Sequence, residues 1–252
     1  MSSTGRGALS LLLLIALGQS APLAAAQLTV FASTAVAAAL RDLAPQFERD
    51  SGNRLTVRYD TTNALKAEID NGPVFDVAIL TAAANEALTD SEKILPQASR
   101  AIARSGIGVV VRAGAPKPDI GTAEAFRAAL LSAKSVAFTA SGASGTYFEG
   151  LLQRLGIAES VNLKALRPQG GAVGELIARG EAELGVQQIS ELLPVAGIDY
   201  IGPLPPEYQS YTVFSAGLGA RAKEARAGRA LITFLSTPAS RKVFTADGME
   251  PP

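Results

Sequence analysis

The sequence predicts an α/β fold made of two lobes, each with a mixed, mostly parallel sheet flanked by helices. Apolar runs rich in β-branched residues alternate with segments of helical periodicity from about residue 28 onward. The strand and helix pattern occurs once in the first half of the chain and again in the second half. A Gly- and Pro-containing stretch at 202–206 is predicted to be a linker. These observations favour two sheets over one long sheet.

The first series spans residues 28–80 in the order βαβαβ. The run 28–32 (LTVFA) is apolar throughout, as expected of a buried strand. The helix predicted at 35–50 carries its large apolar residues at helical spacing, and Pro45 is expected to kink it. The remaining elements of this series are strand 55–59, helix 63–70 and strand 76–80.

The second half opens with a strong strand at 107–111, a helix at 122–131 capped by Thr122, and a strand at 135–139. A further series then follows, with helix 146–155, strand 163–166, helix 172–179 and strand 183–187. The chain closes with strand 211–216 and helices 222–235 and 238–246, the last with Pro238 at its first position.

Residues 1–26 are predicted to be a secretory signal peptide, cleaved after Ala26. Arg6 supplies a positive start, and 8–17 is an apolar run too short for a stable membrane anchor. Alanines at 24–26 offer a small-x-small cleavage site, so the mature chain would begin at Gln27 and be exported. The alternative is a buried amphipathic helix.

Composition excludes several classes of function. The 23 basic and 23 acidic residues are scattered, which argues against a nucleic acid or acidic membrane surface as partner. The chain has no cysteine and no histidine, so it can form neither a disulfide nor a Ser-His-Asp triad. No acidic cluster has metal-ligand spacing, and no complete nucleotide-binding loop occurs. We therefore expect no metal, no cofactor and no catalysis, although a Ser–Lys or twin-carboxylate site stays open.

Small polar residues and glycines gather where predicted strands pass into helices. In open α/β sheets, ligands bind at the carboxyl ends of the strands, and a helix start offers unpaired N–H groups to an anion. Several converging junctions would therefore make an anion site, whereas any one of them alone can be a simple helix cap. The junctions are Ser33 and Thr34, Thr61 to Asn63, Ser144 to Thr146, and Gly170 with Gly171.

Three stretches, LTVFASTAVAAAL, SGASGTYFEGLLQRLGI and GELIARGEAELGVQQISELLPV, resemble type II periplasmic solute-binding proteins. The resemblance runs over essentially all of 28–251 and is nearest to a divergent branch of the molybdate-binding proteins of ABC importers. It implies two lobes closing over a solute, with lobe one at 27–105 and 215–252. Lobe two would be 106–214, with hinge strands at its ends. It also implies a periplasmic location, a membrane permease as partner and a monomer.

The family's oxyanion contacts carry over only in part. Its first-loop serine falls on Ala35 and its tyrosine falls on Gln188. Neighbouring donors would have to substitute, so the resemblance implies a reshaped anion site. Its ligand-binding candidates are Ser33, Thr34, Thr62, Asn63, Ser144, Gly145, Thr146, Gly171, Gln187 and Gln188. Arg104 and Arg167 are candidates to meet a carboxylate.

The leading hypothesis is import of a small oxyanion, with molybdate or tungstate as the family default. A second hypothesis keeps the fold and role but replaces the ligand by a small organic carboxylate. A third makes the chain a sensory module that contacts a receptor. Because neither histidine nor cysteine is available to titrate, we expect ligand binding to change little between about pH 6 and 8.

Overall fold

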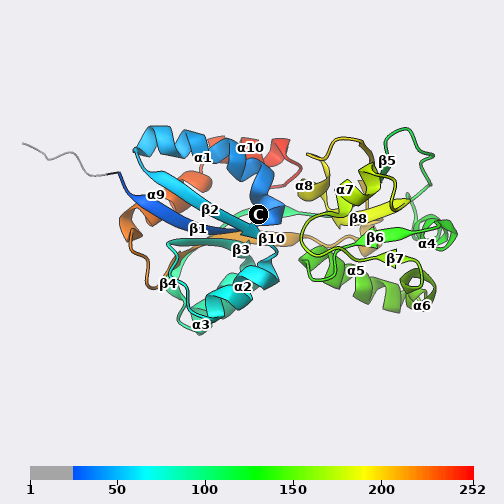
Figure 1. Ribbon diagram of the computed structural model, residues 1–252, viewed down its shortest axis with the longest axis horizontal. Coiled ribbons are helices and arrows are strands. Elements are labelled where there is room, and N and C mark those ends of the chain that lie inside the picture. Colours follow the sequence, from blue (N-terminus) through cyan, green and yellow to red (C-terminus); the bar gives the residue numbers. More distant parts are fainter. Residues whose placement is uncertain (1–24) are drawn as a thin grey trace, which may run out of the picture.

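Two five-stranded sheets lie end to end in the computed structural model, which describes residues 25–252 (Figure 1). The predicted signal peptide falls almost wholly on residues 1–24, outside the described part of the chain. Helices cover both faces of each sheet. The predicted fold class, two mixed sheets flanked by helices, is confirmed.

Sheet one has the order β2 (Arg54–Asp60), β1 (Gln27–Ser33), β3 (Val77–Thr81), β10 (Thr212–Gly219) and β4 (Ile94–Ser105). The first three strands are parallel, and β10 runs antiparallel to both of its neighbours. The internal strand β1 is almost wholly buried, whereas exposed and partly buried residues alternate along the edge strand β2. The burial pattern of these two strands therefore follows from their positions in the sheet.

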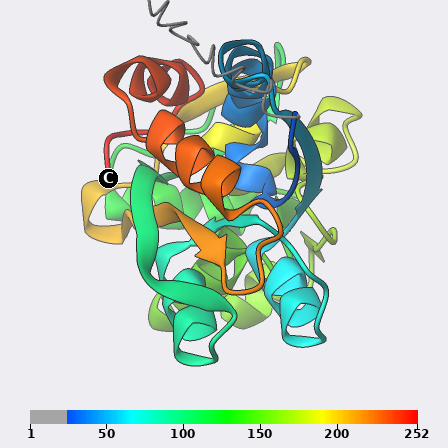
Figure 2. The ribbon, with the colours of Figure 1, turned by 90° about the vertical axis from the view of Figure 1, so that its left-hand side faces the viewer.

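Five helices enclose sheet one. On one face lie α1 (Ala37–Ser51), α9 (Ala225–Leu235) and α10 (Pro238–Ala246), and on the other lie α2 (Thr62–Asp70) and α3 (Ala82–Asp90) (Figure 2). The first face buries Leu40, Leu43 and Phe47 of α1, the apolar stripe read from the sequence. The helix α1 continues through its internal proline, and a short 3₁₀ turn, η1 (Thr34–Val36), precedes it.

Sheet two repeats this arrangement. Its order is β7 (Ala165–Leu166), β6 (Val136–Phe138), β8 (Leu184–Gln188), β5 (Ile107–Arg112) and β9 (Ile198–Pro203). Again three strands are parallel, and β5 runs antiparallel to its two neighbours. Because β8 is central, all five of its residues are buried, including the two glutamines at its carboxyl end.

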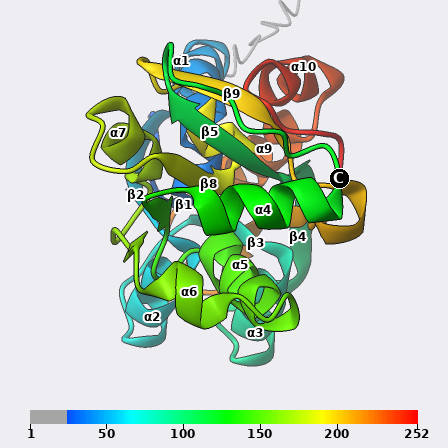
Figure 3. The same cartoon turned by 90° about the vertical axis from the view of Figure 1, so that its right-hand side faces the viewer.

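The helices α4 (Ala123–Ser132), α5 (Ala143–Arg154) and α6 (Ala158–Asn162) cover one face of sheet two (Figure 3). The other face is covered by α7 (Val173–Ala178) and α8 (Ile189–Leu192). Thr122 caps α4 as predicted, accepting a hydrogen bond from the Ala125 N–H at 3.1 Å.

The chain passes between the sheets twice. The first passage joins β4 to β5 at Gly106, and the second joins β9 to β10 through 204–211, which contains the 3₁₀ turn η2 (Pro206–Tyr208). The lobe boundaries read from the sequence, 27–105 with 215–252 and 106–214, stay a prediction. None of the described helices is long and apolar enough to cross a membrane.

The sequence did not predict the helices α3, α6 and α8 or the strands β4 and β9. Pro96 and two arginines interrupt β4, which lies at the edge of its sheet, where a missing N–H is tolerated. The predicted linker at 202–206 overlaps β9, also an edge strand. Edge strands need no continuous apolar run, so the hydrophobic pattern did not reveal them.

Candidate functional site

The carboxyl ends of the parallel strands in both sheets face the space between the lobes. There β1 ends at Ser33, β2 at Asp60, β6 at Phe138 and β8 at Gln188. Residues that follow or end these strands therefore meet across the gap. They line two cavities, one small and one large.

The small one, here called the hydroxyl cavity, has a volume of about 20 Å³. Lobe one lines it with Ser33, Thr34, Thr61 and Thr62, and Thr139 faces it from lobe two. This volume holds roughly one water molecule. The two lobes thus bring five hydroxyl groups around a very small space.

The hydroxyls of this cavity differ in what they bind. Ser33 accepts from the Ala35 N–H at 3.4 Å, and Thr61 caps α2 by accepting from the Ala64 N–H at 3.2 Å. The Oγ1 atoms of Thr62 and Thr139 are buried and have no hydrogen-bond partner within residues 25–252. Buried polar atoms are nearly always paired, so these two hydroxyls are suited to bind a ligand.

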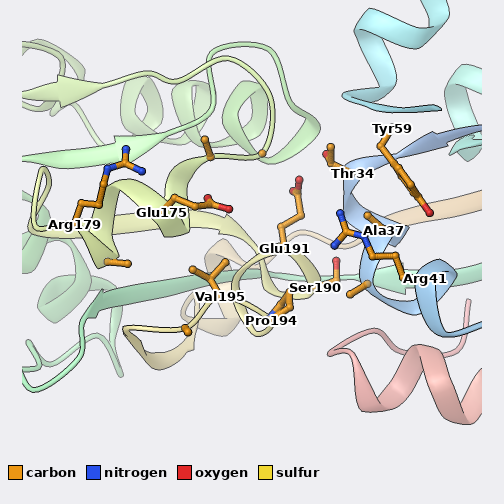
Figure 4. A pocket seen from close by; sticks show the side chains of 15 residues that line it. Thr34, Ala37, Arg41, Tyr59, Glu175, Arg179, Ser190, Glu191, Pro194 and Val195 are labelled. Atoms are coloured by element: carbon orange, nitrogen blue, oxygen red, sulfur yellow. The ribbon is translucent and has the colours of Figure 1, made fainter. Parts of the chain in front are cut away.

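The large one, here called the charged groove, has a volume of about 710 Å³ and is open to solvent. Thr34, Arg41 and Tyr59 line it from lobe one, and Gly171, Glu175 and Glu191 line it from lobe two. Figure 4 shows Glu191 and Thr34 between Arg41 and Tyr59 on one side and Glu175 and Arg179 on the other. The groove therefore carries both signs of charge.

Thr34 and Glu191 line both cavities, so they form the wall between them. Gly171 allows the close approach of these groups. A Cβ atom at Gly171 would lie 3.0 Å from Oε1 of Glu191, 3.5 Å from Cβ of Thr34 and 3.6 Å from Nε2 of Gln187. One carboxyl, one hydroxyl residue and one amide thus converge on a position that lacks a side chain.

Burial raises the pKa of the Glu191 carboxyl above its usual value. The nearby side chains of Thr34 and Gln187 lower this pKa in part. The negative charge of Glu175 raises it further. Both amide atoms of Gln187 are buried, and neither makes a hydrogen bond of normal geometry in the described chain. Ligand binding that changes little between about pH 6 and 8 stays a prediction, and Glu191 is a carboxyl with a shifted pKa, the kind of group that would oppose it.

Arg41 projects from α1 beside Tyr59, with its guanidinium carbon 5.6 Å from the centre of the ring. Burial raises the pKa of Tyr59, and the positive charge of Arg41 opposes that shift. Within the described chain Arg41 forms no ion pair, whereas Arg179 on the other side of the groove is paired with Glu181. Arg41 is therefore available to an anion in the groove.

Asn63 lies outside both cavities and links the lobes. Its Nδ2 donates to the carbonyl oxygen of Ser141 at 2.8 Å in an exposed position. The side chain thus bridges α2 and the turn before α5. Its role in ligand binding stays a prediction.

The candidates Ser144, Gly145 and Thr146 form the first turn of α5 and line neither cavity. Ser144 is buried and Thr146 is exposed. A Cβ at Gly145 would lie only 1.9 Å from the carbonyl oxygen of Thr139, so this glycine lets α5 pack closely on the end of β6. These residues therefore pack behind Thr139 and support the wall of the hydroxyl cavity without lining it.

Gln188 lines the hydroxyl cavity, but its amide is engaged by the strands that join the lobes. With its nitrogen toward Ser105, the amide donates to the Ser105 carbonyl oxygen at 3.0 Å and accepts from the Thr212 hydroxyl at 2.9 Å. Gln187, one residue earlier, is the glutamine whose amide is free.

Both arginines that were predicted to contact a carboxylate ligand are bound to other side chains of the protein. Arg104 binds Glu250 through Nε at 3.1 Å and Nη2 at 2.8 Å, and stacks over Tyr211. Arg167 binds Glu149 at 3.2 Å and Asn162 at 2.7 Å. Neither arginine lines the hydroxyl cavity or the charged groove.

Four lining residues were missed as site residues from the sequence, namely Arg41, Tyr59, Thr139 and Glu191. A signal existed for three of them, because Tyr59 and Thr139 end predicted strands and Arg41 lies seven residues, about two helical turns, after Thr34. Glu191 gave no signal, since its four-residue helix is too short to show periodicity. No group of acidic residues in the described part of the chain could hold a metal ion.

The chain is similar to proteins of known name and to several solved structures. The sequence pattern of the family described as bacterial extracellular solute-binding protein matches residues 28–250. A protein named aconitate isomerase from Pseudomonas sp. is 35% identical over 242 residues, 92% of each chain. The molybdate-binding protein ModA of Azotobacter vinelandii is 26% identical over 239 residues, 89% of this chain and 90% of that one.

Among solved structures, the periplasmic molybdate-binding protein of Azotobacter vinelandii superposes with a TM-score of 0.77. It is 19% identical and covers 89% of this chain and 99% of its own. This likeness shows the two-lobed fold, and the resemblance drawn from the sequence is confirmed. The chain therefore belongs to the bacterial extracellular solute-binding protein family.

Proposed function

We propose that this protein binds a small organic tricarboxylate between its lobes, as the exported binding component of a transport system. The family supplies the general role of solute binding. The ligand class rests on the shape and charge of the cleft and on one relative. Molybdate, the first hypothesis from the sequence, becomes the alternative.

The observation that carries the proposal is the connection between the hydroxyl cavity and the charged groove. A tetrahedral oxyanion is compact and needs a single cage of donors. Here the cage adjoins a groove of about 710 Å³ that presents the unpaired guanidinium of Arg41. A ligand with several carboxylates can place one group among the hydroxyls and another near Arg41, where a planar guanidinium binds carboxylates well.

The 35% identical relative points to the same class of ligand. Its name refers to aconitate, an unsaturated tricarboxylate, and the match covers 92% of both chains. The relative named for molybdate is more distant, at 26% identity. The substituted positions Ala35 and Gln188 agree with this ranking, because they depart from the residues that the resemblance implies for an oxyanion site.

The transport role implies a membrane permease as partner and a monomeric, periplasmic carrier cleaved after Ala26. Adjacent genes separate this role from sensing, since a permease and an ATPase indicate import and a receptor kinase indicates signalling. Intact-mass analysis of secreted protein tests the cleavage site.

Catalysis is a second candidate function. The sequence predicts no enzyme, and the family is one of binding proteins. The relative, however, is named an isomerase. The Glu191 carboxyl in the cleft is the structural observation that favours this candidate.

The ligand class is tested by a thermal-shift screen followed by calorimetry. The panel contains cis- and trans-aconitate, citrate and tricarballylate, with molybdate, tungstate, sulfate and phosphate as oxyanions. We expect tricarboxylates to raise the melting temperature and bind with micromolar or tighter affinity, about −8 kcal/mol or better. A response to molybdate with none to any tricarboxylate would reject the proposal and restore the oxyanion hypothesis.

A further inference from the structure

Glu191 is the acidic residue in the wall between the two cavities. It lines both of them, and Gly171 leaves its Oε1 atom accessible next to Thr34 and Gln187. Among the described residues Glu191 forms no ion pair. A purely structural carboxylate at such a place is usually paired.

We propose that the Glu191 carboxyl moves a proton between two carbon atoms of an unsaturated tricarboxylate bound in the cleft, so that the site isomerises its ligand. This inference rests on the tricarboxylate ligand class proposed above. It goes beyond solute binding, because it gives the same cleft a chemical step.

The step is an allylic proton shift within the unit CH₂–C=CH. An oxygen of ionised Glu191 takes a proton from the CH₂ group, which lies between a carboxylate and the double bond. The C–H electron pair forms a new double bond to the central carbon, and the former double-bond pair moves to the far carbon. Glu191 returns the proton there and a new C–H bond forms. Atoms and electrons balance without any cofactor or oxidant.

The surroundings of Glu191 suit this role. A carboxyl with a raised pKa is a stronger base when ionised and keeps its proton to a higher pH than an ordinary glutamate. The groups facing it are Thr34 from η1, Gln187 from β8, Glu175 from α7 and, across the groove, Arg41 from α1. Arg41 is the cation among them and can stabilise the charge that develops on the substrate carboxylates, whereas the Gln187 amide is completely buried and lines neither cavity.

The size of the hydroxyl cavity adds a second argument. On that side its volume of about 20 Å³ leaves little space for water beside Glu191, and a ligand that fills the open charged groove would cover the other side of the carboxyl. A proton held on the carboxyl can then return to the substrate before it exchanges with solvent. We therefore expect isomerisation with only partial uptake of solvent hydrogen.

The test follows cis- and trans-aconitate by proton NMR in D₂O with the full mature chain. Wild-type protein should interconvert the two isomers and introduce deuterium at the allylic carbons. Glu191→Gln should bind with wild-type affinity within about threefold and lose at least a hundredfold in both rates. Glu149→Gln is the matched control, because Glu149 pairs with Arg167 away from both cavities, and it should keep wild-type rates.

Each outcome separates the inference from the proposed function. Wild-type protein that binds aconitate but neither isomerises nor exchanges it overturns the inference and leaves the ligand class standing. Full activity in Glu191→Gln also overturns it. If wild-type protein binds no tricarboxylate, the proposed function itself fails. Should the Gln variant not bind, Glu191→Asp replaces it, with reduced rates and retained binding expected; unchanged rates would reject the role.

Discussion

The hydroxyl cavity and the charged groove lie on opposite sides of Thr34 and Glu191, and they differ in both size and charge. The first is about 20 Å³ and mostly neutral, lined by hydroxyls from the ends of strands in both lobes. The second is about 710 Å³ and carries Arg41, Glu175 and Glu191. Neutral donors can hold a carboxylate or an oxyanion equally well, so the groove is the part that distinguishes the two classes of ligand.

The two cavities also differ in how they arise from the chain. The hydroxyl residues sit at strand–helix junctions, where Ser and Thr are favoured for local reasons as well. The charged residues of the groove come from α1, from α7 and its C-terminal end, and from α8, and folding brings them together. Substitutions in each cavity can therefore be matched with controls elsewhere.

The largest expected effect comes from Arg41→Ala, which removes the unpaired cation of the groove. A hydrogen bond to a charged group contributes about 1.5–3 kcal/mol, so tricarboxylate affinity should fall roughly ten- to hundredfold. Calorimetry measures the change. Arg104→Ala and Arg167→Ala serve as controls and should keep the affinity, since both arginines lie away from the cavities. Loss of binding in a control but not in Arg41→Ala would contradict the assignment.

A smaller loss is expected from Gly171→Ala. The new methyl group would lie 3.0 Å from Oε1 of Glu191 and would push the carboxyl out of the shared wall. Overpacking of this kind costs about 1 kcal/mol, or roughly fivefold in affinity. Gly150→Ala is the control, because its methyl group would meet only Arg154 at an ordinary 3.6 Å. Calorimetry and thermal unfolding of both variants check the result, and equal affinities would count against the shared wall.

Asn63→Ala tests the bridge between the lobes. The variant loses the exposed 2.8 Å hydrogen bond to the Ser141 carbonyl, which is present when the lobes are close. The expected cost is about 0.5–1 kcal/mol, so affinity should weaken roughly two- to fivefold. Unfolding of the free protein should be nearly unchanged, since each lobe keeps its core. Small-angle scattering with and without ligand would show whether closure is reduced.

The smallest effect concerns stability and pH. The pKa of Glu191 is raised in the folded protein. Its contribution to the unfolding free energy is therefore fully present below the ordinary glutamate pKa and is lost as the pH rises through the pKa of the folded state. Burial also raises the pKa of Asp247, so wild type alone does not isolate Glu191. The difference in unfolding free energy between wild type and Glu191→Gln should therefore fall as the pH rises from about 4 to 8. Denaturant titrations measure it, and a constant difference would contradict the shift.

The sequence predicted the parallel strands better than the antiparallel ones. The runs at 28–32, 76–80 and 183–187 are buried centrally, so they are apolar along most of their length. The strands β4 and β9 lie at sheet edges and include polar residues and prolines, so the same rule missed them. Edge position alone does not hide a strand, because the edge strand β2 was predicted at 55–59 from its sequence.

The sequence by itself determined the fold class and the strand–helix junctions that supply Ser33, Thr34 and Thr62, because these depend on local periodicity and helix-cap preference. Only the tertiary structure decided which polar groups are free. In the folded chain Gln188 is hydrogen-bonded to Ser105 and Thr212, and Arg104 forms an ion pair with Glu250. The tertiary structure left Arg41 facing the groove and placed the partly buried Glu191 beside Gly171. Pairing and burial depend on residues distant in the chain, so no local pattern could have revealed them.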